Sequence, residues 1–439
     1  MVDSRAGAIW WRPDAEAAAP ATAFPGAGGK SLAFGGLVFF TVVLLLSPQT
    51  FFPVLKTIRI ALLASGVAIG AHMMDATVRR EPATPSGAET SIAFALLGWT
   101  VLTVPFSMWP GGSVAVLTDQ FIKALVFFWM IAAMVTNRER LTTFAWSLTI
   151  CSIPLAMSAL VHFAKGDFLS TGTSIKRIEG YAGLSGNPND LALTLNLMIP
   201  FTCALLVTTS SWLKRAVAAC ALFLSVPAVI VTFSRAGFLT LVAIAVMGTI
   251  CFLRRGAFVP AIGVIVVALA ITPVLPKGYV ERLSTIVDID ADPTGSAQGR
   301  WTDYQVATDV VIANPILGVG LGQDILALNA ARGHATWRSV HNAFLEYAVD
   351  LGIPGILLFL SLLFASFGTA RRIERFTSRT RRLWDVSVFA GAAQVALVAF
   401  AVAAFFHPIA YQFYFFCVAG LAVALKAVSR NEARQIEAR

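Results

Sequence analysis

A polar stretch between Pro276 and Val340 holds cations whose types and spacing could do chemistry. The basic residues of this stretch and the histidine that follows it are Arg282, Arg300, Arg332, Arg338 and His341. A guanidinium group can grip phosphoryl oxygens through two parallel hydrogen bonds, and an imidazole can take up and return a proton near neutral pH. The combination predicts a site that binds an anionic substrate and moves a proton.

His341 lies in Arg338-Ser-Val-His-Asn-Ala-Phe-Leu-Glu346, just before an apolar run. The usual histidine pKa of about 6.5 suits a general base, and Glu346 could orient the ring. A histidine at the start of a membrane helix is also common as an interfacial polar residue, and Glu346 could instead cap the helix or pair with a cation. We predict His341 as the catalytic base and Glu346 as its candidate orienting acid.

Two arginines stand where local structure would hold them. Arg235 lies in the short turn Thr232-Phe-Ser-Arg-Ala-Gly237, and Arg300 opens a predicted helix that Asn314-Pro315 ends. The residues that share one face of that helix are Trp301, Tyr304, Thr308, Val311 and Ile312. We expect the helix to lie on the membrane surface with its aromatic side down. The alternatives are an interfacial arginine between two helices and, for Arg300, ordinary headgroup contact.

The rest of the chain must position these residues, and its composition is that of a membrane protein. The 439 residues are 57% hydrophobic and only 13% charged, which excludes a water-soluble globule. Apolar runs of about 17 to 25 residues predict about twelve membrane-spanning helices. The predicted spans lie near residues 31–47, 54–72, 91–108, 113–136, 141–163, 190–209, 213–232, 236–253, 257–275, 346–369, 384–406 and 408–427. The expected fold class is therefore an all-α polytopic membrane protein with one large loop that contains short helices.

Basic residues set the expected orientation. If the amino terminus is cytoplasmic, every inner loop is basic, as the positive-inside rule requires. These inner cations are Arg79, Arg80, Arg138, Arg140, Lys214, Arg215, Arg254, Arg255, Arg371, Arg372, Arg375, Arg379, Arg381 and Arg382. The net charge of +9 is then mostly a topology signal, and we expect no nucleic-acid partner.

This orientation divides the chain into segments. The predicted organisation is a flexible cytoplasmic tail without a cleavable signal pattern (1–30), nine spans (31–275), an outer catalytic loop (276–342), three spans (343–427) and a cytoplasmic tail (428–439). The five cysteines fall in or beside apolar spans, so neither a disulfide framework nor a zinc cluster is expected.

Twelve cations break the inside rule, because this topology places them at or near the outer face: Lys56, Arg59, Lys123, Lys165, Lys176, Arg177, Arg235, Lys277, Arg282, Arg300, Arg332 and Arg338. Snorkelling or local pairing, such as Asp119 with Lys123 or Arg177 with Glu179, would explain about half of them. We predict that others form a basic vestibule for phosphate, with Arg235 and Arg300 as the best candidates and Arg338 and Lys123 beside them.

Three other patterns favour plainer interpretations. Gly318-Val-Gly-Leu-Gly322 follows a helix rather than a strand, which argues against a dinucleotide site and predicts a flexible turn. Asp288-Ile-Asp-Ala-Asp292 lacks the glycine and glutamate of a calcium loop, so no metal site is expected. His72, His162 and His407 have no evident partners in the sequence.

Four short motifs together resemble the O-antigen ligase and polymerase superfamily. They cover about residues 180–365, in this order: Ser185-Gly-Asn-Pro-Asn-Asp190, Ser234-Arg-Ala-Gly237, Gly299-Arg-Trp301 with Asn314-Pro-Ile-Leu-Gly-Val-Gly-Leu-Gly322, and His341-Asn-Ala-Phe-Leu-Glu346. The five amino-terminal spans match the family only by hydropathy.

The resemblance implies a metal-independent glycosyltransferase of the bacterial inner membrane. Such an enzyme moves a glycan from undecaprenyl diphosphate to an acceptor hydroxyl on the periplasmic side and needs no cofactor. On the matching motifs, the family roles fall on Arg235 and Arg300 as diphosphate ligands and on His341 as the base. Arg338 and Lys123 match the family only loosely, so their substrate-binding roles are our inference.

Several alternatives stay open at this point. The acceptor could be another lipid-linked repeat unit (a polymerase), a lipid core (a ligase) or a protein hydroxyl (an oligosaccharyltransferase). A polysaccharide transporter or flippase is the rival from another class, although the ionisable residues gather at one face rather than at the midplane.

Overall fold

The apolar runs form helices, which satisfy their own backbone hydrogen bonds where no water is present. The computed structural model describes residues 31–169, 177–181, 183–256, 258–271, 279, 296–333 and 337–437. Within these ranges all regular elements are helical and no strand occurs. The all-α fold class predicted from the sequence is thus confirmed for the described chain.

The first part of the chain contains α1 (Leu32–Leu46), η2 (Pro48–Thr50), α2 (Pro53–Thr57), α3 (Ile60–Arg79), α4 (Ala88–Thr103), η3 (Val104–Phe106), α5 (Pro110–Val116), η4 (Leu117–Phe121), α6 (Ile122–Met134), α7 (Arg138–Lys165), η5 (Gly183–Gly186), α8 (Pro188–Thr208), α9 (Trp212–Val231) and α10 (Arg235–Arg254). The second part contains α11 (Phe258–Ile271), α13 (Ser296–Ala313), α14 (Asp324–Ala331), α15 (Ala343–Thr377), η7 (Arg381–Leu383), α16 (Trp384–Ala404) and α17 (Phe413–Glu437). The π-helical turn η4 joins α5 to α6 in one continuous run.

Ten of the described helical runs are long and apolar enough to cross a membrane. Each of the twelve predicted spans coincides with a helix, but the first and ninth coincide with α1, of 15 residues, and α11, of 14 described residues. At 1.5 Å per residue such helices reach about 22 Å, less than a hydrocarbon core of about 30 Å. The described residues therefore contain ten spans of full length, against the twelve predicted for the whole chain.

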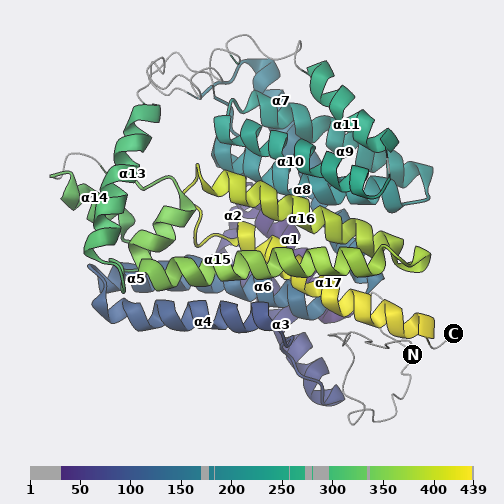
Figure 1. Ribbon diagram of the computed structural model, residues 1–439, viewed down its shortest axis with the longest axis horizontal. Helices are drawn as coiled ribbons and strands as arrows, with labels where there is room; N and C mark the ends of the chain where they lie inside the picture. The colour runs from purple at the N-terminus through teal and green to yellow at the C-terminus, as the bar shows by residue number, and fades with distance from the viewer. Residues whose placement is uncertain are drawn as a thin grey trace, which may run out of the picture.

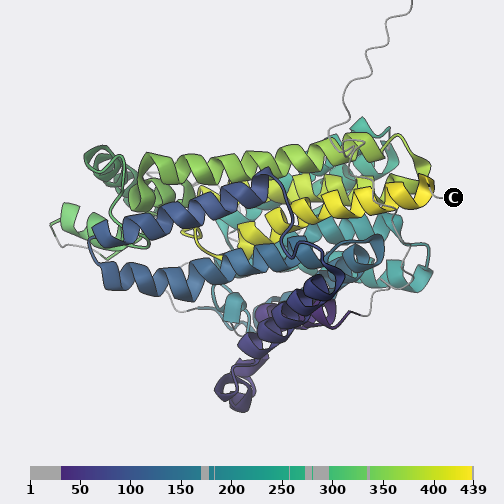
Figure 2. The ribbon, with the colours of Figure 1, turned by 90° about the horizontal axis from the view of Figure 1, so that it is seen from below.

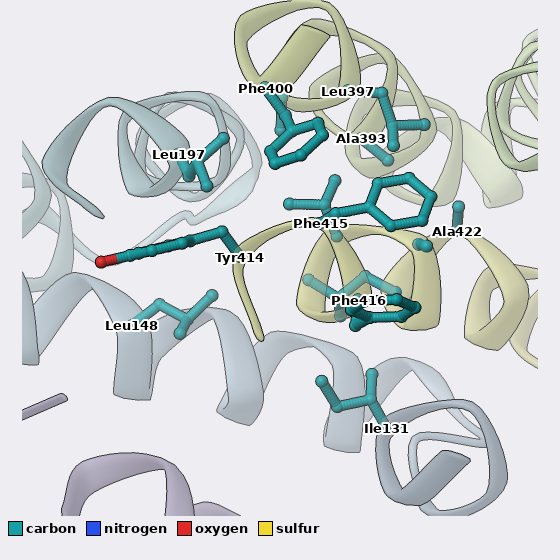
Figure 3. Close-up of a cluster of buried hydrophobic side chains, with 14 of the residues drawn as sticks. Ile131, Leu148, Leu197, Ala393, Leu397, Phe400, Tyr414, Phe415, Phe416 and Ala422 are labelled. Atoms are coloured by element: carbon teal, nitrogen blue, oxygen red, sulfur yellow. The ribbon is translucent and has the colours of Figure 1, made fainter. Parts of the chain in front are cut away.

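The helices form a central group and a periphery. Of the span in α16, 83% is buried inside the protein, against 17% of the span in α3. Figure 3 shows Phe400 of α16, Leu197 of α8 and Phe415 of α17 among the packed side chains of the centre. The spans in α8 and α16 are mostly buried, 78% and 83%, because other helices enclose them.

The loop helices lie at one end of the molecule. Figure 1 shows α13 and α14 at the end opposite the carboxyl terminus, with α13 running across the ends of the long helices. In Figure 2, turned by 90°, α13 is again at that end, whereas α3 slants away from the main group. The predicted loop helix is thus present, and it ends at Ala313, directly before Asn314-Pro315.

Candidate active site

The start of α10 holds Arg235 in a defined position. The Ser234 side chain caps the helix by accepting a hydrogen bond from the Gly237 amide at 3.0 Å. A Cβ atom on Gly237 would lie 2.6 Å from the Ala192 Cβ, so glycine is needed for α8 to approach α10. Arg235 is the first residue of α10, and the predicted short turn fixes it at the helix start.

Asn189 ties this helix start to two other segments. Its Oδ1 accepts hydrogen bonds from Ser234 Oγ at 2.7 Å and from Arg177 Nη2 at 2.9 Å. Asn187 caps α8 by accepting from the Asn189 amide at 2.9 Å. The Ser185–Asp190 motif therefore both caps α8 and positions an arginine. For Arg177, the structure gives Asn189 as a partner, where local pairing with Glu179 was the simple expectation.

Five side chains from distant segments lie close enough for their charges to affect one another's pKa. Burial and the charges of Arg300 and Arg235 lower the pKa of Arg177. Burial, followed by the charges of Arg300, His341 and Arg177, lowers the pKa of His407 to about 3. We call these five residues, Arg177, Arg235, Arg300, His341 and His407, the cation cluster. Because His407 is neutral at physiological pH, hydrogen bonding rather than charge is what it can offer a ligand.

Arg300 reaches this cluster because α13 is docked firmly. Its buried face consists of Asp303, Ala307 and Val310, which pack toward α14 and the start of α15. Tyr304 Oη donates to the Phe405 carbonyl oxygen at 2.6 Å. Tyr304, of the predicted common face, is directed to Phe405, while Trp301 and Ile312 of that face are 60% and 71% exposed. The predicted placement on the membrane surface stays a prediction.

Arg338, in the segment between α14 and α15, packs against α13. Its Nη2 is 3.4 Å from Oδ1 of the buried Asp303, which also pairs with Arg332. A Cβ atom on Gly299 would lie 2.8 Å from Arg338 Nη1, so the glycine of Gly299-Arg-Trp makes room for this guanidinium. Arg338 keeps 44% of its side chain exposed, which leaves it able to meet a second anionic group.

His341 has a strained backbone and a defined proton. Its φ is 43°, a left-handed conformation that costs a non-glycine residue about 1–2 kcal/mol. Nδ1 lies 2.8 Å from the Ser339 carbonyl oxygen. A carbonyl only accepts, so we assign the proton of the neutral ring to Nδ1 and the free lone pair to Nε2. Burial is the largest cause that lowers the pKa of His341, and the charges of Arg300 and Arg338 lower it too, whereas the hydrogen bond to Ser339 and the charge of Asp303 act to raise it. A neutral, half-buried imidazole with a free nitrogen is suited to accept a proton.

The glycine-rich turn supports α15 where that helix breaks. Gly352 has φ 69° and ψ −172° and divides α15 at a kink. The amides of Val319 and Gly320 donate to the carbonyl oxygens of Val349 and Asp350 at 2.9 Å. The Cβ that glycine lacks at position 318 would fall 2.4 Å from the Asp350 backbone. The turn, predicted as flexible, is therefore held closely on both sides.

Glu346 and Asp350 fasten the turn between α16 and α17. Glu346 Oε2 accepts from the Ala410 amide at 3.1 Å, and Asp350 Oδ2 accepts from Tyr411 Oη at 2.9 Å. Both carboxylates are buried. These contacts carry His407 into the cation cluster, and the direct orienting role of Glu346 on His341 stays a prediction.

Lys123 pairs with an acid of its own helical run. It is the second residue of α6, about midway along the run Pro110–Met134, and its Nζ is 3.3 Å from Asp119 on an exposed surface. The local pairing considered for Lys123 is thus confirmed, whereas its predicted role in phosphate binding stays a prediction.

Some predicted features fall outside the described residues. They are the tail 1–30, Lys176, Lys277, Arg282 and the Asp288–Asp292 segment. Within the part of the chain that the structure describes, no group of three His, Cys, Asp or Glu side chains is arranged to hold a metal ion.

The sequence gives no evident partner for His407, places Arg177 only among the twelve outer-face cations, and presents Asn189 only within the Ser185–Asp190 motif. His407 lies 66 positions beyond His341 in the sequence. The two histidines come together only through the packing of α15, α16 and α17. The available signals were the His407-Pro408 pair at a predicted turn and a second asparagine in Asn187-Pro-Asn189.

The comparison with protein families agrees with these motifs. Residues 220–360 match the family model described as O-antigen ligase, which confirms most of the resemblance expected over 180–365. The match begins inside α9 and ends inside α15, and it contains Arg235, Arg300, Arg338 and His341. No curated protein matches the chain. Residues 220–360 are thus similar to the O-antigen ligase family, in a chain whose described residues form ten helical runs long and apolar enough to cross a membrane.

Proposed function

We propose that the protein transfers a glycan from an undecaprenyl-diphosphate-linked donor to an acceptor hydroxyl at the periplasmic face of the bacterial inner membrane. The observation that carries the proposal is the cation cluster, in which the charges of Arg235 and Arg300 act on Arg177 and the charge of Arg300 acts on both histidines. Guanidinium groups suit a diphosphate, and a neutral imidazole suits a hydroxyl. The family of residues 220–360 supports the same class of reaction.

The proposed reaction is a single displacement. Nε2 of His341 takes the proton of the acceptor hydroxyl, whose oxygen forms a bond to the anomeric carbon of the donor sugar. The bond between that carbon and the diphosphate oxygen breaks, and the electron pair leaves with the diphosphate. Attack from the face opposite the leaving group inverts the anomeric centre. Neither a metal ion nor a cofactor takes part in the step.

Arg235 and Arg300 stabilise the charge that develops on the leaving diphosphate, an effect worth about 3–4 kcal/mol for a well-placed donor. Arg338 is assigned to the outer side of the diphosphate, because it is half exposed and adjoins Arg300 through Gly299. Lys123 would meet the lipid-proximal part of the donor from α6. Glu346 is assigned an orienting role that acts through the 405–412 turn, where it holds Ala410.

This function requires the predicted topology. The segment 276–342 then faces the periplasm, and the tails 1–30 and 428–439 face the cytoplasm, with spans in 31–275 and 343–427. The position of α13 and α14 at the end opposite the carboxyl terminus supports this orientation.

The test uses purified protein in liposomes with an undecaprenyl-diphosphate-linked oligosaccharide, with and without a lipid-core acceptor. A product ladder without added acceptor identifies a polymerase, and a single acceptor-dependent product identifies a ligase. His341→Ala should lower the rate about 10²- to 10⁴-fold. Wild-type turnover by this variant would refute the proposed role of His341, and donor crossing the bilayer without transfer would favour the transporter alternative.

A further inference from the structure

We propose that Asp324 is a positioning residue that holds His341 in its working conformation, an inference that rests on the proposed role of His341 as the base. Asp324 begins α14 and is 3% exposed. Its Oδ2 accepts a hydrogen bond from Ser339 Oγ at 2.8 Å and another from the Val340 amide at 3.1 Å. One carboxylate oxygen therefore fixes both residues that precede the histidine.

The same segment determines the state of the imidazole. The Ser339 carbonyl oxygen lies 2.8 Å from His341 Nδ1. Ser339 therefore binds Asp324 through its hydroxyl group and the imidazole ring through its backbone carbonyl. His341 itself is held at φ 43°, a conformation that persists only where the surroundings impose it. Asp324 supplies two of the contacts that impose it.

The loss of these contacts would change the base rather than the fold as a whole. Without Asp324, residues 339–341 can relax toward an ordinary extended conformation, and the Ser339 carbonyl no longer faces Nδ1. The ring is then free to carry its proton on Nε2, the nitrogen that must accept the proton of the acceptor hydroxyl. Asp324 acts through Ser339 and Val340, and it touches no reacting atom in this scheme.

This assignment accounts for an acid whose use the sequence does not reveal. Glu346 binds the Ala410 amide and Asp350 binds Tyr411, so each of those two buried carboxylates holds the 405–412 turn. Asp324 differs from these two carboxylates, because its contacts run to Ser339 and Val340 directly before His341. Asp324 stands 17 residues before His341 in the sequence. A positioning acid at that separation cannot be recognised from local spacing.

The experiment compares Asp324→Ala, Asp324→Asn and Ser339→Ala, with Asp309→Asn as the matched control. Asp309 is an exposed aspartate on α13 with no part in the proposed site. Transfer kinetics are measured in liposomes, and the tautomer of His341 is read from ¹⁵N-histidine magnetic resonance, with His341→Ala used to assign the signal.

We expect Asp324→Ala to lower kcat about 10²-fold, the effect of a misplaced catalytic group, with KM within about twofold. Asp324→Asn keeps an acceptor oxygen and should retain activity within about tenfold of wild type, whereas Ser339→Ala, which loses one hydrogen bond, should fall about threefold. The wild-type His341 signal should show the proton on Nδ1, and Asp324→Ala should move it toward Nε2. Asp309→Asn should match wild type in both measurements.

Wild-type kcat in Asp324→Ala, or loss of activity with an unchanged His341 tautomer, would overturn the inference. The latter result would assign Asp324 a purely structural role. If His341→Ala is inactive while Asp324→Ala is fully active, this inference alone fails. Full transfer by His341→Ala would remove the proposed function as well.

Discussion

Cations at the two ends of the helices have opposite surroundings. At the end near the carboxyl terminus, Arg255 of the α10–α11 turn pairs with Glu374 of α15 at 2.6 Å, and Lys426 of α17 pairs with Glu89 of α4. At the other end, the charges that act on Arg177 come from Arg300 and Arg235. The first arrangement neutralises each cation with a carboxylate, and the second concentrates positive charge.

The difference separates charges that join helices from charges to which the proposed function assigns a substrate. A buried cation paired with its own carboxylate joins two helices, and its charge is neutralised without a bound ligand. Like charges brought together repel one another, and such an arrangement is useful where a bound anion supplies the opposite charge. The pairing of Arg338 with Asp303 lies between the two cases, since the carboxylate is shared with Arg332 and Arg338 stays half exposed.

The largest effect is expected at the paired end. Glu374→Ala would leave Arg255 partly buried without its carboxylate, and breaking such a pair costs about 3–5 kcal/mol of stability. Gln394, whose Nε2 donates to Glu374 Oε2 at 2.7 Å, would also lose its acceptor. The unfolding midpoint in detergent should fall, while transfer activity per folded molecule stays at the wild-type level. A stable Glu374→Ala protein that has lost activity would show that the two ends are not separate in function.

The cation cluster should respond in the opposite way. Arg300→Gln removes one of several like charges, so the unfolding midpoint should hold or rise, whereas kcat/KM should fall about 10²- to 10³-fold through lost stabilisation of the diphosphate. Arg254→Gln is the control, because Arg254 is an exposed arginine at the far end of α10. Loss of stability in Arg300→Gln without loss of activity per folded molecule would reverse the comparison.

The sequence predicted those features that depend on short stretches of chain. Apolar runs located the helices, and the motifs around Arg235, Arg300 and His341 located three members of the cation cluster, because a helix start or a short loop determines each of them. The end of α13 at Ala313 followed from Asn314-Pro315.

Features made by packing between distant segments escaped prediction. His407 joins the cluster because Glu346 and Asp350 hold the 405–412 turn against α15. Arg177 joins it through Asn189, an amide that the sequence offered only as part of a turn. The lengths of the apolar runs also predicted too many full spans, since α1 ends at Leu46 and is too short to cross a bilayer.

The smallest effect tests the cluster through pH. Besides burial, the charges that act on His341 are those of Arg300 and Arg338, which lower its pKa, and of Asp303, which raises it. Arg338→Gln removes one lowering charge, so the pKa of His341 should rise. A base works only when deprotonated, so the acid limb of the kcat/KM profile should move to higher pH, by less at high salt because Arg338 is half exposed. The control is Arg382→Gln, because Arg382 is an exposed arginine in η7 between α15 and α16. This variant should leave the acid limb at its wild-type position. A shift to lower pH in Arg338→Gln would mean that the arginine favours the protonated ring, which its positive charge should not do.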